Sequence, residues 1–237
     1  EMAALFLCLK ITWFLRYIIM KASVTVPSLS EITLEQYQRF LKVQQINKDD
    51  EYIIQLKMIE IFCNVDFKDA RNIKFTDVER IIEKLTETFQ EKPNLIKTFK
   101  MNGVEYGFIP SMEEMTFGEY IDVDTYLPQD NEMHLAMNVL YRPITSKKAG
   151  KYSIEDYDIN TKERMKQMPL SVMLSATFFL QNLGLELLSV TSNYLQEEMG
   201  KQQLSPQDLE KNGDGIQASM LSLKEILKDL KVSLPLN

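Results

Sequence analysis

The stretch that decides the fold runs from Lys97 to Pro143 and reads KTFKMNGVEYGFIPSMEEMTFGEYIDVDTYLPQDNEMHLAMNVLYRP. Its strongest turn signal is Asn102-Gly103, which separates two short runs in which apolar and polar residues alternate. A type I′ turn requires positive φ at both central residues, and Asn followed by Gly adopts these angles at little energetic cost. We therefore predict a half-buried β-hairpin over residues 98–109 that turns at this dipeptide.

Two helices are predicted after the hairpin. The sequence Thr116-Phe-Gly-Glu119 has the form of a capping box, in which the Thr hydroxyl covers a free amide and the Glu side chain reaches back. Phe117, Tyr120 and Ile121 share one face of this helix, and we expect that face to hold the hairpin against the next helix. The next helix is indicated by apolar residues at helical spacing, namely Met133, Ala136, Met137, Leu140 and Tyr141.

Three more helices are predicted before this stretch. Thr33-Leu-Glu-Gln36 and Thr76-Asp-Val-Glu79 have the pattern of further capping boxes, and residues 52–62 repeat apolar side chains at helical spacing. Residues 24–27 favour a short strand. Together with the hairpin and the later helices, this order predicts a mainly helical α+β core domain over residues 22–199 with one central hairpin.

The connecting segments are predicted from their composition. Residues 65–75 are expected to form a polar connection between two helices. The sequence KKAGK at residues 147–151 predicts a basic loop tip, either solvated or in contact with an acidic partner. Residues 152–159 favour a second short strand.

Two apolar stretches raise the question of a membrane. Residues 1–21 form an apolar leader, but Lys10 and Arg16 interrupt it, and a charge at mid-membrane is costly. A translated leader and a membrane segment both remain open for it. Residues 167–185 carry no charge over nearly transmembrane length. Because Ser, Thr, Gln and Asn side chains interrupt them, we expect the buried central helix of a domain instead.

The chain continues with a polar, glycine-bearing linker over residues 200–215 and an apolar seam over residues 216–234. The seam residues are spaced alternately four and three apart, which predicts an amphipathic C-terminal helix. Two docking surfaces remain open for it, namely the core of its own chain and a second copy or partner. The candidate partner-binding residues of the seam are Ile216, Met220, Leu223 and Leu227.

Composition excludes several classes of function. The chain has 237 residues, of which 45% are hydrophobic and 26% charged, a balance typical of a globular domain. Its net charge of −7 disfavours general nucleic-acid binding, which depends on basic residues that neutralise phosphates. Cys8 and Cys63 provide neither a disulfide framework nor a zinc site, and we expect Cys63 to be a small core residue.

We predict no catalytic, cofactor or metal site from the residues. His134 is the one histidine of the chain, and we expect it at the surface, off the apolar face of its helix. Glu119, Asp122 and Asp124 could form a divalent-ion site, but their spacing spreads them over different sides of a helix, so we expect a solvated acidic face instead. One enzymatic alternative remains open, a metal-dependent activity that uses the dispersed carboxylates of Glu113, Glu114, Glu119 and Asp122.

Three phrases of the sequence carry a resemblance to a known family. Residues 103–110, 115–122 and 137–143 resemble tail or baseplate assembly proteins of tailed bacteriophages, nearest to the T-even baseplate hub assembly family. The likeness extends more weakly over residues 30–194. It implies a non-enzymatic structural or assembly protein that contacts other tail or baseplate proteins or itself. It also implies a location in the host cytoplasm during assembly or in the virion. Phe117 and Tyr120 join the seam residues as candidate partner-binding residues.

Overall fold

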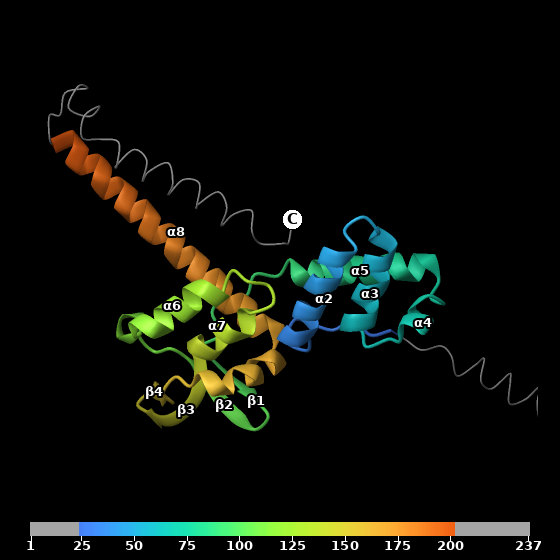
Figure 1. Cartoon of the computed structure of the whole chain (residues 1–237), viewed down its shortest axis with the longest axis horizontal. Coiled ribbons are helices and arrows are strands. Elements are labelled where there is room, and N and C mark those ends of the chain that lie inside the picture. The colour runs from blue at the N-terminus through green and yellow to red at the C-terminus, as the bar shows by residue number, and fades with distance from the viewer. Residues whose placement is uncertain (1–23, 202–237) are drawn as a thin grey trace, which may run out of the picture.

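The computed structural model describes residues 24–201, which fold into helices α2 to α8 and one four-stranded antiparallel sheet (Figure 1). Helices α2 to α5 gather at one end of the molecule, the sheet with α6 and α7 lies at the other, and α8 extends away from the domain. The predicted mainly helical α+β class is confirmed. The leader over residues 1–21 and the seam over residues 216–234 lie outside the described residues.

The N-terminal helices are α2 (Leu34–Ile46), α3 (Glu51–Phe62), α4 (Phe67–Ala70) and α5 (Phe75–Phe89). Their inner faces meet in an aromatic cluster, in which the Phe62 ring centroid lies 5.1 Å from that of Phe40 and 5.0 Å from that of Phe89. Tilted pairs at this distance are favourable beyond the area that they bury. Cys63 is half-buried and packs against this core, as predicted.

One of the two capping boxes predicted in these helices is present. The Thr33 side chain accepts from the Gln36 amide, and the Gln36 side chain accepts from the Thr33 amide in return. The prediction for Thr76 was wrong. Helix α5 begins at Phe75, so Thr76 lies inside the first turn and cannot be the N-cap. The predicted polar connection over residues 65–75 contains the short helix α4, and residues 24–27 form no strand.

The predicted hairpin consists of β1 (Thr98–Met101) and β2 (Val104–Phe108). Phe99 pairs with Tyr106 in its register, and their stacked rings lie 5.3 Å apart. The turn residues Asn102 and Gly103 have φ angles of 52° and 79°, as the type I′ turn requires.

The hairpin is half of a larger sheet, because β3 (Tyr141–Lys148) and β4 (Lys151–Ile154) extend it in the order β1-β2-β3-β4. The predicted basic loop tip is the turn of this second hairpin, where Ala149 and Gly150 have φ angles of 50° and 78°. The second predicted strand, over residues 152–159, is shorter than expected and ends at Ile154. The chain passes from α7 directly into β3.

The remaining helices are η1 (Met112–Glu114), α6 (Phe117–Tyr126), α7 (Met133–Leu140), η2 (Ile159–Gln167) and α8 (Leu170–Lys201). Helix α7 buries its apolar face as predicted, with Ala136, Met137 and Leu140 inaccessible to solvent, whereas Tyr141, which was predicted in the same helix, begins β3 and is also fully buried. Helix α8 buries its first turns, from Leu170 to Phe178, whereas Val190 is 61% exposed. The buried-helix prediction therefore holds for the first part of α8 only.

Within the described residues, one stretch is long and apolar enough to cross a membrane by length and composition, namely Leu170–Thr191 of α8. The buried first turns of this stretch belong to the protein core. There, the Leu34 amide donates to the Met168 carbonyl at 2.9 Å, and the Leu170 amide donates to the Ile32 carbonyl at 2.8 Å. These bonds join the start of α2 to the start of α8.

Candidate functional site

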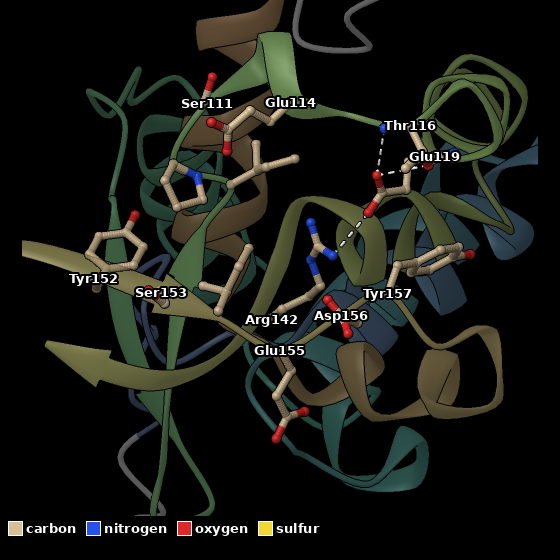
Figure 2. Close-up of a pocket in the computed structure, with 13 residues that line it drawn as sticks. Ser111, Glu114, Thr116, Glu119, Arg142, Tyr152, Ser153, Glu155, Asp156 and Tyr157 are labelled. Carbon is tan, nitrogen blue, oxygen red and sulfur yellow. Dashed lines mark hydrogen bonds and ion pairs between the residues drawn. The ribbon is translucent and has the colours of Figure 1, made fainter.

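A pocket of about 600 Å³ lies between the end of β4 and the N-terminal end of α6 (Figure 2). Ser153 and Ile154 of β4, together with the three residues that follow, form one side of it. Thr116 and Glu119 form the other side, and the segment from Ile109 to Glu114 closes the third. Arg142 of β3 lies between them, so four separate segments of the chain contribute to one cavity.

The centre of this pocket is a buried ion pair. Arg142 and Glu119 are 7% and 6% exposed, and the Arg142 Nη1 atom lies 2.9 Å from Glu119 Oε1. The other carboxylate oxygen of Glu119 accepts from the Thr116 amide at 2.7 Å and from the Thr116 hydroxyl at 2.9 Å. A single carboxylate therefore completes the predicted capping box of α6 and neutralises an arginine. The prediction that Glu119 belongs to a solvated acidic face was wrong, because this buried cation draws it inward.

Arg142 retains a donor that no described residue satisfies. Its Nε atom is buried and has no hydrogen-bond partner among the described residues. A guanidinium carries five N–H donors, and a buried donor without an acceptor costs free energy. Figure 2 shows the guanidinium facing the cavity between Glu119 and the side chains of the opposite wall. The arginine is thus placed to offer hydrogen bonds to a bound group.

The walls of the pocket are acidic. Glu114, Glu155 and Asp156 line it, and none of the three forms an ion pair with a described residue. Counted with Glu119 and Arg142, the lining carries four negative charges and one positive charge, a net −3. The pocket therefore favours a group of positive charge, even though an arginine lies at its centre.

Two tyrosines fix the shape of the pocket. The Tyr152 hydroxyl donates to the Phe108 carbonyl at 2.7 Å, and its ring lies so close to Gly107 that a Cβ there would come within 2.5 Å of it. The Tyr157 hydroxyl donates to Asp122 Oδ2 at 2.8 Å. Burial, followed by this bond to Asp122, raises the pKa of Tyr157. Both rings are thereby held in place before any ligand binds.

Two walls of the pocket belong to a strongly acidic part of the chain. Residues 101–141 contain eight acidic residues and no Lys or Arg, whereas the whole chain has a net charge of −7. The net negative charge of the protein is therefore concentrated in the segment that carries β2, α6 and α7. The acidic residues are Glu105, Glu113, Glu114, Glu119, Asp122, Asp124, Asp130 and Glu132.

Next to the pocket, α6 turns three large apolar side chains toward solvent. Phe117, Tyr120 and Ile121 are 78%, 58% and 44% exposed, and we call them the α6 ridge. The prediction that this face holds the hairpin against α7 was wrong. Val123 and Tyr126, on the same side of the helix as Glu119, pack against the core instead.

Of the four carboxylates of the enzymatic alternative, Glu114 and Glu119 line the same pocket, whereas Glu113 and Asp122 are not among its lining residues. Glu119 is engaged by Arg142 and Thr116, and Asp122 is engaged by Tyr157. Among residues 24–201, no group of three or more His, Cys, Asp or Glu side chains is placed to hold a metal ion. The seam residues Ile216, Met220, Leu223 and Leu227 lie outside the described residues.

The prediction for His134 was also wrong, since this side chain is 5% exposed. Its Nδ1 atom lies 3.2 Å from Gln38 Nε2, and its Nε2 atom lies 3.7 Å from Glu163 Oε1. Gln38 of α2 and Glu163 of η2 thus both contact the imidazole, and η2 packs against α7, so the side of the helix that carries His134 is buried as well. Burial lowers the pKa of His134, and nearby Lys166 lowers it further, against the opposing effect of Glu163.

Arg142 is the residue of this site that the sequence predictions missed. It follows 41 residues without a Lys or Arg, and a lone cation after an acidic run is the signal that could have indicated it. Comparisons of the chain with protein-family models, with curated proteins and with solved structures found no match. The function is therefore argued from the pocket, the α6 ridge and the resemblance of the three phrases.

Proposed function

We propose that this chain is a non-enzymatic assembly protein of a bacteriophage tail or baseplate, which binds a neighbouring protein through the α6 ridge. The observation that carries the proposal is the exposure of Phe117, Tyr120 and Ile121 on one ten-residue helix. It acts in the host cytoplasm while the tail assembles, and its partners are other tail or baseplate proteins or a second copy of itself.

The α6 ridge has the chemistry of an interface centre. Aromatic residues dominate the binding energy of protein interfaces, and grouped exposed apolar side chains mark such surfaces. Complete burial of one large apolar side chain contributes about 1.5–3 kcal/mol. The acidic residues around the ridge would form the polar rim that surrounds such a centre.

The bacteriophage assignment is supported by where the resembling phrases lie. Residues 115–122 form the start of α6 with its ridge, and residues 137–143 include Arg142. The phrase over residues 103–110 forms β2 and one wall of the pocket. The three sequence segments that resemble tail assembly proteins therefore contribute residues to the candidate site.

Replacement of the ridge tests the proposal. The variant Phe117→Ser/Tyr120→Ser is compared with Phe75→Ser/Tyr52→Ser, which changes the same residue types at exposures of 63% and 71% on α5 and α3. Each variant is mixed with the tail and baseplate proteins encoded beside its gene, and complexes are measured by size exclusion with light scattering. We expect the ridge variant to lose association and the control to retain it.

Two results would overturn the proposal. In the first, the ridge variant associates as well as the parent. In the second, the parent associates neither with itself nor with any of those tail and baseplate proteins. Circular dichroism of both variants checks that they are folded, which the exposure of all four side chains leads us to expect.

A further inference from the structure

We propose that the acidic pocket accepts one Lys or Arg side chain of the protein that docks on the α6 ridge. Arg142 then offers a hydrogen bond to a carbonyl group of the same partner segment. This inference rests on the proposed function, because it names the chemistry of the partner at the neighbouring surface. It assigns a role to a cavity that the ridge alone does not explain.

The sign of the charge decides between a cationic and an anionic guest. The charge of Arg142 is already balanced by Glu119 at 2.9 Å, so it cannot also balance an incoming carboxylate or phosphate. An anion in this pocket would instead meet Glu114, Glu155 and Asp156, which have no cation of their own among the described residues. A partner's ammonium or guanidinium group would pair with these carboxylates.

The unsatisfied donor of Arg142 adds a second, independent requirement. A guest that brings only a positive charge would supply no further acceptor, and the buried Nε atom would still have no hydrogen-bond partner among the described residues. A neutral oxygen such as a peptide carbonyl can accept from the guanidinium without adding negative charge to the pocket. A basic residue within a polypeptide carries both groups, the cation on its side chain and the carbonyl on its main chain.

The size and position of the pocket suit such a guest. A volume of about 600 Å³ lies within the range of about 300–1,000 Å³ that is usual for binding sites. Thr116 and Glu119 line the pocket while Phe117 and Tyr120 lie on the outer side of the same helix. A helix of ten residues is about 15 Å long, so one short partner segment can contact both.

The pocket is also shaped in advance. Thr116 holds Glu119, Asp122 holds Tyr157, and the Phe108 carbonyl holds Tyr152. A preorganised site loses less conformational entropy when it binds, which favours recognition of a single side chain.

Blocked amino acids test the inference without knowledge of the partner. The full chain is titrated with N-acetyl-arginine methylamide and N-acetyl-lysine methylamide, and amide chemical shifts are followed by NMR. The matched probes are the neutral norleucine and the anionic glutamate derivatives. We expect saturable shifts at Thr116, Ser153 and Tyr157 with the two cationic probes, reduced by added salt, and none with the glutamate probe.

A charge-reversed pocket provides the matched control. The variant Glu155→Lys/Asp156→Lys changes the lining from −3 to +1, and both residues are exposed, so the protein should fold normally. We expect this variant to bind the cationic probes more than about tenfold more weakly than the parent does. The control Glu83→Lys/Glu87→Lys makes the same change on the exposed face of α5 and should leave binding unchanged.

The inference is overturned if the cationic probes cause no saturable shift. It is equally overturned if the glutamate or norleucine probe binds as well as they do, or if the charge-reversed variant binds them like the parent. These failures are distinguishable from failure of the proposed function. If the ridge variant still abolishes association while the probes fail, the ridge remains the docking surface and the pocket has no part in it.

Discussion

Helices α6 and α7 are consecutive, pack against each other and carry clear apolar faces, yet they direct those faces in opposite ways. Helix α7 buries Met137 and Leu140 completely, and its His134 as well. Helix α6 exposes Phe117 and buries Glu119. The difference shows that an apolar face predicts the buried side of a helix only when no polar group on another face gains more free energy by being buried.

The magnitudes explain which group prevails in α6. Burying Phe117 would contribute about 1.5–3 kcal/mol. Turning Glu119 outward to allow this would leave Arg142 buried without its counter-charge, at a cost of about 3–5 kcal/mol. It would also disrupt the capping box at Thr116, which is worth about 1 kcal/mol. The ion pair and the cap together outweigh the burial of Phe117, and turning the helix to bury the rest of the ridge would withdraw Val123 and Tyr126 from the core.

The largest expected effect comes from removing the charge that orients α6. Glu119→Gln keeps a side chain that can complete the capping box but leaves Arg142 as an unpaired buried cation. We expect the free energy of unfolding, measured by urea denaturation, to fall by about 3–5 kcal/mol. The double variant Glu119→Gln/Arg142→Met should recover much of this loss, because no buried charge remains unpaired. A loss below about 1 kcal/mol in the single variant would contradict this explanation.

The next effect is expected in the core of α7. Met137→Ala removes a side chain that is completely buried, so it leaves a cavity and should lower the free energy of unfolding by about 2–5 kcal/mol. Urea denaturation measures this value on the same scale as the α6 variants. A result close to that of a surface substitution would mean that α7 is less tightly packed than its burial indicates.

A pH dependence should come from the polar side of α7. Because the pKa of His134 is lowered in the folded protein, the unfolded chain binds more protons as the pH falls below about 6.5. Stability should therefore be fully present well above about pH 6.5 and should decrease as the pH falls through about 6.5 toward the lowered pKa of His134 in the folded protein. The variant His134→Gln should reduce this slope in urea denaturation, since the chain has one histidine. An unchanged slope would exclude His134 as its source.

The smallest effect on stability is expected at the α6 ridge. Phe117→Ala removes a ring that is 78% exposed, so the free energy of unfolding should change by less than about 0.5 kcal/mol. Thermal and urea denaturation of this variant beside Met137→Ala compare the two helices directly. A loss of several kcal/mol at Phe117 would mean that the ring is buried in solution and would remove the ridge as a docking surface.

The predictions that held rest on local signals, although the local pattern at Thr76 was misleading. The Asn102-Gly103 turn, the capping box at Thr33 and the apolar face of α7 all depend on residues a few positions apart. The pairing of Arg142 with Glu119 is not local, and periodicity identifies a face without saying whether it points inward. The second hairpin was not predicted because Ala149 occupies a turn position with positive φ, where Asn, Asp or Gly is usually found. The burial of His134 was not predicted because Gln38 and Glu163, which contact its ring, are far from it in the sequence.

The hydrogen bonds that join the start of α2 to the start of α8 have a consequence for synthesis on the ribosome. The Gln167 side chain donates to Glu35, which lies 132 residues earlier in the chain. At about 5–20 residues per second, the first helix waits roughly 7–26 s before the segment that anchors it has been translated. During that interval α2 lacks its contacts with the segment from Gln167 to Leu170, whereas α3 and α5, whose Phe62 and Phe89 rings contact Phe40 and Tyr37, have already been translated. The N-terminal helices are thus the part of the nascent chain on which a chaperone would have time to act.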